Sequence, residues 1–213
     1  MKYKVMIVED QTMPRELFEL RVQASERFEL VLSIDNAALA DVYCLRFPVD
    51  LILMDVITRD GENGLDAAAR IKRAFPQIKI IIVTSMPECS YLKRAKEIGV
   101  ESFWYKEEQR ESLLDVMERT MAGESDYPDA TPELQLGLAS SYAFTDRELE
   151  VLREMTGGDT NQEIADRLNM SVATVKTHIL NMLEKTGFRN RTELAVRARE
   201  SGLVILNRKS GEL

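Results

Sequence analysis

The chain has 213 residues, 45% hydrophobic and 30% charged, with 10 glycines, 6 prolines and a formal net charge of −8. This composition excludes collagen-like, low-complexity and wholly disordered proteins, and the net charge taken alone argues against a nucleic-acid partner. Two cysteines, Cys44 and Cys89, are too few for a disulfide framework, and no apolar run approaches the roughly 20 residues of a membrane helix. No secretory cleavage site follows the N-terminus, so we expect a cytoplasmic protein.

Short apolar runs alternate with helical patterns over the first 122 residues. Strands are predicted at 3–8, 28–34, 50–57, 78–83 and 102–105, with helices near 13–26, 36–46, 64–75, 89–98 and 109–122. Runs that are apolar on both faces are typical of a parallel sheet covered by helices. The pattern therefore predicts an α/β domain over residues 1–122 with a five-stranded parallel sheet. We expect the flavodoxin-like order 2-1-3-4-5, a common order for open sheets of this kind.

Acidic residues follow two of these strands, at the edge where open parallel sheets bind ligands. Glu9 and Asp10 follow the first strand and Asp55 follows the third. Strands one and three are neighbours in this order, so the three carboxylates are expected to converge, which favours Mg²⁺. Asp55 can then act as a nucleophile toward phosphorus, while Thr84 and Lys106, at the ends of strands four and five, bind phosphoryl oxygens. No glycine-rich phosphate loop follows strand one, which argues against a nucleotide or flavin cofactor.

Residues 1–122 resemble a response-regulator receiver domain. The resemblance is carried by an acidic pair, an aspartate, a threonine and a lysine that stand at strand ends in the family's order, here Glu9-Asp10, Asp55, Thr84 and Lys106. The resemblance implies that Asp55 is the phosphoacceptor. It also implies that Glu9, Asp10, Asp55 and the carbonyl of Val56 bind Mg²⁺, and that Thr84, Phe103 and Lys106 form the switch. The loop at 56–64 departs from the family pattern because it lacks Met-Pro and has what looks like one extra residue. Glu107 stands where a proline is common, so no cis peptide is expected there.

Residues 123–140 contain two glycines, two prolines and four acidic residues without an apolar period. This indicates a linker, with one short helical turn around 132–138. From 141 to 213 the pattern is helical only. Two S/T-x-x-E sequences, at Thr145 and Thr160, predict helix starts. Ser171 is expected to cap a third helix and Asn190 to start a fourth, which gives an all-α four-helix domain.

The charges of this second domain are unevenly distributed. Residues 145–166 hold two basic and seven acidic side chains, whereas 171–199 hold six basic and two acidic ones. A positive segment of this kind suits contacts with phosphates. Residues 161–169 and 172–186 supply the two helices of a helix-turn-helix. The outward face of the second carries Lys176, Thr177, Leu180, Asn181 and Glu184, while Val172, Val175, Ile179, Met182 and Leu183 face the core.

From Phe144 to about Leu206 the chain resembles the NarL/LuxR-type helix-turn-helix family. The residues that carry the resemblance are Thr145-x-Arg147-Glu148, Asn161-x-Glu163-Ile164-Ala165, the run from Ser171 to His178, and the run from Asn190 to Leu194. It implies base contacts by Lys176, Thr177 and Leu180, although position 180 is often polar in the family. It implies DNA-backbone contacts by Asn161, Thr174, Asn181, Lys185 and Arg191. A homodimer is expected in the active state, formed through the last helix at 190–201, because DNA half-sites pair two such modules.

The two resemblances together predict a two-component response regulator that binds double-stranded DNA as a transcription factor. A sensor histidine kinase or a small phosphodonor is expected to switch it by Mg²⁺-dependent phosphorylation of Asp55. Two alternatives remain. One is a phosphorylation-independent regulator whose acidic pocket is vestigial or holds only metal. The other is an aspartyl-phosphate phosphatase or phosphotransferase, which is disfavoured because 55–57 lacks the second acid of a D-x-D motif, so we expect no enzyme.

Overall fold

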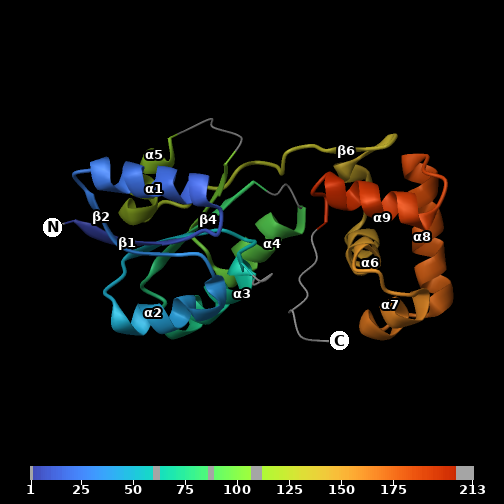
Figure 1. Ribbon diagram of the computed structural model, residues 1–213, viewed down its shortest axis with the longest axis horizontal. Coiled ribbons are helices and arrows are strands. Elements are labelled where there is room, and N and C mark those ends of the chain that lie inside the picture. Colours follow the sequence, from blue (N-terminus) through green and yellow to red (C-terminus); the bar gives the residue numbers. More distant parts are fainter. Residues whose placement is uncertain (1, 60–62, 86–88, 107–111, 205–213) are drawn as a thin grey trace. The chain divides into compact units, whose positions relative to one another are not determined.

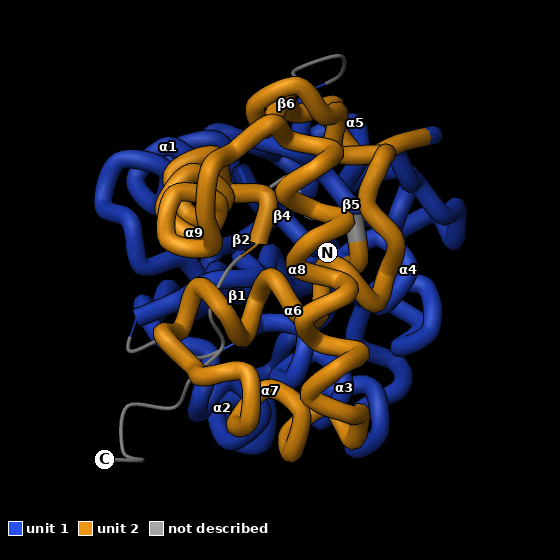
Figure 2. Tube along the Cα trace, turned by 90° about the vertical axis from the view of Figure 1, so that its right-hand side faces the viewer, with its two compact units in different colours: residues 1–85, 91–129, 209–213 blue, residues 86–90, 130–208 orange. Residues whose placement is uncertain are grey.

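The computed structural model describes residues 2–59, 63–85, 89–106 and 112–204. Two compact units divide the chain, one built chiefly from residues 1–85 and 91–129, the other from 86–90 and 130–208 (Figure 2). Each unit is a separate body with its own hydrophobic core. Within the described ranges, none of the helices is both long and apolar enough to cross a membrane.

The first unit is a five-stranded parallel sheet in the order β2-β1-β3-β4-β5, as predicted. The strands are β1 (Tyr3–Val8), β2 (Phe28–Ile34), β3 (Leu51–Met54), β4 (Lys79–Thr84) and β5 (Ser102–Tyr105). The helices are α1 (Thr12–Ala24), α2 (Ala40–Arg46), α3 (Gly64–Ala74), α4 (Cys89–Ile98) and α5 (Leu113–Ala122), and a 3-10 turn, Ala37–Leu39, precedes α2. The predicted start of α5 at 109–111 lies outside the described residues.

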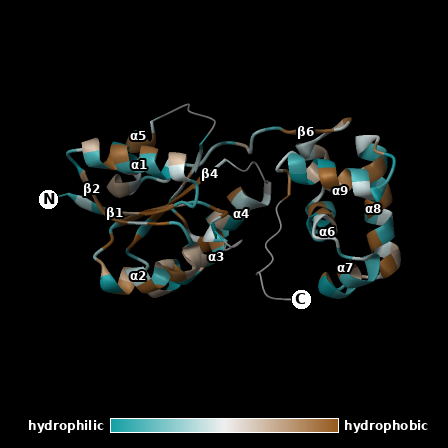
Figure 3. Cartoon of the chain, in the orientation of Figure 1, coloured by the Kyte–Doolittle hydropathy of each residue, from teal (hydrophilic) through white to brown (hydrophobic). Residues whose placement is uncertain are grey.

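Helices cover both faces of this sheet, which is why its strands are apolar on both sides (Figures 1 and 3). One face packs Val5, Leu53 and Ile81 against α1 and α5. Successive side chains of a strand point to opposite faces. The alternate residues Met6 and Ile52 are also fully buried, so they fill the opposite face, where α2 and α3 lie. This double burial fixes the strands and places their carboxyl ends at one edge of the sheet.

Residues 123–140 differ from the expected linker. Residues 124–127 lie beside β5, where the amide of Phe103 donates a hydrogen bond of 2.8 Å to the carbonyl of Asp126. Further on, a two-stranded hairpin of β6 (Gln135–Leu136) and β7 (Ala139–Ser140) stands where a helical turn was expected. The tip contains Gly137 at φ +63°, and a Cβ there would lie 2.2 Å from the Thr186 carbonyl oxygen. Glycine at a left-handed position favours a tight hairpin over a helical turn.

The second unit is helical after this hairpin. A 3-10 turn, Ser141–Ala143, leads into α6 (Asp146–Thr156), α7 (Asn161–Arg167), α8 (Val172–Thr186) and α9 (Arg191–Glu200). Both predicted capping boxes form, with Thr145 and Thr160 accepting from the amides of Glu148 and Glu163. The predicted inner face of α8 packs into the core, with Val175, Ile179 and Met182 buried and Val172 and Leu183 partly buried. Asn169, at φ 52°, forms the turn between α7 and α8.

Candidate functional site

Three carboxylates converge at the carboxyl edge of the sheet. Glu9 and Asp10 follow β1, and Asp55 follows the neighbouring strand β3. One carboxylate oxygen from each lies within 4.8 Å of the others. Glu9 is 1% and Asp55 5% exposed, while Asp10 is half-buried. A cluster of oxygen donors with this separation fits a hard divalent cation.

Lys106, directly after β5, reaches into this cluster. Its Nζ lies 2.8 Å from Asp55 Oδ2 and 2.5 Å from Glu9 Oε2. The Lys106 amide donates to the Thr84 carbonyl at 2.9 Å, which continues the β4–β5 pairing and fixes the base of the side chain. The Lys106 side chain is 9% exposed, so it compensates charge in a low-dielectric environment where an unpaired carboxylate would be costly.

Burial dominates the electrostatics of the cluster. It raises the pKa of Glu9 to about 7, with a further contribution from the Asp55 charge, and Lys106 opposes this rise. Burial also raises the pKa of Asp55, against the lowering effect of Lys106. Burial by itself would lower the pKa of Lys106, but the two carboxylates outweigh it and raise that pKa. One ammonium therefore does not balance three acids, and a bound cation would complete the compensation.

Glycine at position 64 shapes the chain beside Asp55. A Cβ on Gly64 would lie 1.8 Å from the Asp55 carbonyl oxygen, so a larger residue cannot occupy this position without a backbone shift. The Gly64 amide donates to the carbonyl of Val56 at 2.8 Å, and the Val56 amide donates to Asp55 Oδ1 at 2.7 Å. Asn63 caps α3 by accepting from the amides of Leu65 and Asp66. The Val56 carbonyl, predicted to bind metal, is thus engaged in the turn that orients Asp55.

The other predicted switch residues lie on neighbouring strands. Thr84 ends β4 and is fully buried, paired in register with Tyr105. Phe103 on β5 is 2% exposed, and its ring centroid lies 5.0 Å from that of Tyr105. The unusual loop after Asp55 is described only at its ends, because 60–62 lie outside the described residues. Glu107, where a proline is common in the family, also lies outside them. Thr58 at the first of these ends accepts from the Ala37 amide at 3.0 Å.

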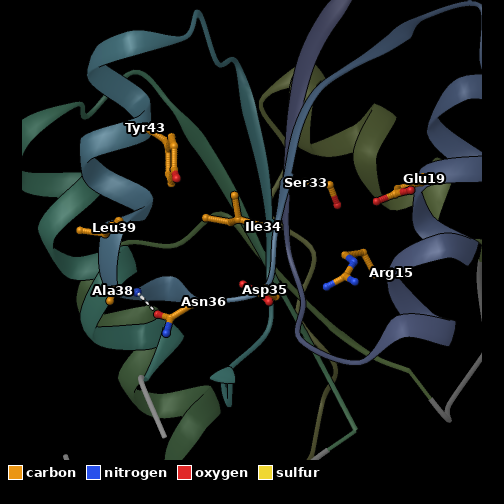
Figure 4. Close-up of a pocket in the computed structure, with 9 residues that line it drawn as sticks. All are labelled: Arg15, Glu19, Ser33, Ile34, Asp35, Asn36, Ala38, Leu39 and Tyr43. Atoms are coloured by element: carbon orange, nitrogen blue, oxygen red, sulfur yellow. Dashed lines mark hydrogen bonds between the residues drawn. The ribbon is translucent and has the colours of Figure 1, made fainter. Parts of the chain in front are cut away.

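Arg15 of α1 joins this edge to a neighbouring pocket. Its Nη1 donates to the Glu9 carbonyl at 3.0 Å. The pocket has a volume of about 540 Å³ and wraps around the end of the outer strand β2, with Arg15, Glu19 and Ser33 on one side and Tyr43 on the other (Figure 4). Nothing in the sequence pattern singles out Arg15, whereas the Asn-Gly pair at the start of α3 is a recognisable signal for Gly64.

The predicted DNA-contact residues fall into two groups. Five of them are exposed on α8, namely Thr174, Lys176, Thr177, Leu180 and Asn181. The remaining three, Asn161, Lys185 and Arg191, are half-buried and make hydrogen bonds within the unit. Arg191 donates to Asn161 Oδ1 at 3.0 Å and to the Asp159 carbonyl at 2.7 Å. The exposed group forms one continuous helical face with donors and an apolar side chain, as base and phosphate contacts require.

Lys185 pairs with a buried acid. Its Nζ lies 2.6 and 2.8 Å from the two carboxylate oxygens of Glu148, donates to the Ala143 carbonyl at 2.8 Å, and sits 5.9 Å from the centroid of the Phe144 ring. Glu148 is 3% exposed and also accepts from the Thr145 amide at 2.8 Å. Burial opposes ionisation of Glu148, but these hydrogen bonds hold its pKa below the usual value. Lys185 therefore stabilises the packing of α6 against α8.

Comparisons with known proteins agree with this two-unit description. The family of response regulator receiver domains matches residues 5–118, and the luxR family of bacterial regulatory proteins matches residues 142–198. The chain is 32% identical over 209 residues to the response regulator protein VraR of Staphylococcus epidermidis, covering 96% of this chain and 100% of that protein. It is similar in fold to RcsB dimers bound to two parallel DNAs, with a TM-score of 0.61 and 19% identity over 93% of this chain and 98% of that one. RcsB from Salmonella enterica serovar Typhimurium, bound to the rprA promoter with phosphomimetic BeF3⁻, gives a TM-score of 0.58 and 21% identity over 92% and 98% of the two chains.

Proposed function

Because this chain belongs to the two-component response regulators with a LuxR-type DNA-binding domain, we propose that phosphorylation of Asp55 controls its binding to DNA. The observation that carries the proposal is the convergence of Glu9, Asp10, Asp55 and Lys106 at one edge of the sheet. The phosphodonor is a sensor histidine kinase or a small phosphorylated compound in the cytoplasm. The receiver unit would correspond to 1–122 and the DNA-binding unit to 141–213.

Mg²⁺ is the cation that this site fits best, since its donors are carboxylate oxygens. Glu9, Asp10 and Asp55 would hold it, with the carbonyl of Val56 as a further ligand. The bound ion would neutralise the carboxylates and the negative charge that develops on the transferred phosphoryl group. Burial raises the pKa values of Glu9 and Asp55, so the same ion would also favour their ionised forms.

The reaction is a phosphoryl transfer to a carboxylate. A carboxylate oxygen of Asp55 attacks phosphorus, an oxygen–phosphorus bond forms, and the bond from phosphorus to the donor's leaving group breaks. Lys106 then pairs with the phosphoryl oxygens, for which its present position on Asp55 prepares it. The hydroxyl of Thr84 moves to donate to the same oxygens, and the side chain of Phe103 moves with Thr84. No turnover of a separate substrate is involved.

DNA binding is assigned to the exposed face of α8. Lys176, Thr177 and Leu180 are proposed to face bases, and Thr174 and Asn181 the backbone. Asn161 and Arg191 hydrogen-bond to each other and would contact the backbone as a pair. Lys185, which is held by Glu148, is proposed to support the domain instead of contacting phosphate. Two copies, joined through α9, would occupy paired half-sites when Asp55 is phosphorylated.

Intact-mass spectrometry after incubation with acetyl phosphate tests the phosphorylation step. We expect a single phosphoryl adduct on the wild type with Mg²⁺, and none on Asp55→Asn or in the presence of a chelator. Asp115→Asn, a matched change at an exposed aspartate of α5, should leave the adduct unchanged. An unmodified wild type would favour the phosphorylation-independent regulator, while an adduct on Asp55→Asn would assign phosphorylation to another residue.

A further inference from the structure

Residues 124–127, here called the strap, cover the outer edge of β5. The Phe103 amide donates to the Asp126 carbonyl at 2.8 Å, and the Asp126 amide donates to Ser102 Oγ at 3.2 Å. Ser102 and Asp126 form an isolated parallel bridge. An edge strand normally exposes unpaired amides and carbonyls. Here the chain itself occupies part of that edge, immediately before the second unit begins at residue 130.

The Tyr127 side chain fastens the strap to the end of α4 and to β5. Its hydroxyl donates to the Val100 carbonyl at 2.7 Å, and the ammonium of Lys96 lies 5.0 Å from its ring centroid. Burial raises the pKa of Tyr127, so the hydroxyl remains a donor at neutral pH. The ring of Tyr127 lies 6.4 Å from the ring of Phe103, within the range of aromatic contacts.

Two residues of α5 make further contacts, one with Asp126 of the strap and one with Ser102 of β5. Arg119 pairs with the carboxylate of Asp126. Ser102 Oγ, which accepts from the Asp126 amide, lies 2.7 Å from the hydroxyl of Thr120. These two contacts do not involve Phe103. The Asp126 carbonyl accepts from the Phe103 amide, and the Tyr127 ring lies beside the Phe103 ring. Phe103 is therefore a point at which a change within β5 can reach the strap.

We propose that Tyr127 is a positioning residue that passes the state of Phe103 to the strap, so that phosphorylation releases the strap from β5. The proposal rests on the proposed function, because it assumes that phosphorylation of Asp55 moves Phe103. Release of four residues would lengthen the covalent connection to the second unit by up to about 13 Å. With a longer connection, two DNA-binding units can reach paired half-sites while each stays covalently linked to its own receiver unit.

The first test compares DNA affinity in the full chain before and after phosphorylation, for wild type, Tyr127→Ala, Tyr127→Phe and Tyr43→Ala. The probe is a duplex selected from a random-sequence library by the phosphorylated wild type. We expect phosphorylation to tighten binding of the wild type about fivefold or more, and this ratio to fall to about one in Tyr127→Ala. Tyr127→Phe, which keeps the ring, should restore the ratio, and Tyr43→Ala, a tyrosine change on α2, should retain it. A wild-type ratio in Tyr127→Ala would overturn the proposal.

The second measurement needs no variant. Amide exchange of Phe103 in the wild type reports directly on its hydrogen bond to Asp126. Strap release predicts about tenfold or more faster exchange at Phe103 after phosphorylation, and unchanged exchange would overturn the proposal even if Tyr127→Ala failed to fold. Intact mass separates the two hypotheses. A wild type without adduct contradicts the proposed function, whereas an adduct without a change at Phe103 contradicts only the role of the strap.

Discussion

Replacing Lys185 by methionine should destabilise the second unit by leaving Glu148 buried without its cation. Removing one partner of a fully buried ion pair costs about 3–5 kcal/mol. The Lys185 side chain is 32% exposed and that of Glu148 only 4%, so water enters on the lysine side and reduces the cost. We expect a loss of about 2 kcal/mol, which corresponds to roughly 30-fold faster amide exchange in the cores of α6 and α8.

Hydrogen exchange on the full chain measures this loss, while the fluorescence of Trp104, in the first unit, reports whether the other unit stays folded. The double variant Lys185→Met/Glu148→Gln should recover part of the loss because it removes the unpaired charge. In the folded unit the pKa of Glu148 is lowered by its hydrogen bonds. Its ionised carboxylate therefore contributes fully to stability above the unfolded pKa of 4.5, and this contribution is lost as pH falls through the lower pKa of the folded state. The wild-type advantage over Lys185→Met should shrink accordingly at acidic pH.

Lys176→Met provides the matched control on the same helix. Lys176 is exposed, so its removal should change stability by less than about 0.5 kcal/mol. If Lys176 contacts phosphate, its loss reduces the slope of log affinity against log salt by about one. Lys185→Met should leave that slope unchanged. A stable Lys185→Met with a reduced salt slope would refute this reasoning and return Lys185 to the DNA backbone.

Three other predictions concern single positions. Gly64→Ala should destabilise the first unit by about 3 kcal/mol, because its Cβ collides with the Asp55 carbonyl; a loss below about 1 kcal/mol in urea unfolding followed by Trp104 fluorescence would contradict this. Because the pKa of Glu9 is raised to about 7, the folded state binds more protons than the unfolded state, and metal-free stability should fall as pH rises from about 4.5 to about 7. Glu9→Gln should flatten this decline in urea midpoints measured across that range, and an equally steep decline in the variant would assign the effect to another group. Leu180, 59% exposed on α8, should contact a thymine methyl, so replacing one thymine by deoxyuridine should weaken wild-type binding but not that of Leu180→Ala, and equal losses in both would contradict the contact.

Much of the acidic site could be predicted from the sequence because parallel strands bring their carboxyl ends to one edge. Glu9 and Asp10 follow β1, Asp55 follows β3 and Lys106 follows β5, so their convergence depends on the order of these three strands. Runs that are apolar on both faces indicate a covered parallel sheet, and its strand order is the one that the receiver resemblance implies. The fixed position of Gly64 against Asp55 depends on backbone approach, which composition and periodicity do not reveal.

Contacts between distant, individually ordinary residues were beyond prediction. Glu148 was recognisable as a helix-capping residue, but its pairing with Lys185, 37 positions later, depends on how α6 packs against α8. The sequence predicts a linker at the strap because its residues have no apolar period. Its position comes from single side-chain contacts, chiefly those of Tyr127, that no periodic pattern encodes. Periodicity thus predicts elements and edges, whereas specific long-range pairs require the three-dimensional structure.

The central claim is that the acidic edge of the first unit controls DNA binding by the second. Its most direct test is the affinity of the 213-residue chain for the selected duplex, with and without acetyl phosphate and Mg²⁺, in wild type and Asp55→Asn. We predict tighter binding of the wild type after phosphorylation, and no response in Asp55→Asn. Equal affinity of phosphorylated and unphosphorylated wild type, with the adduct confirmed by mass, would contradict the claim.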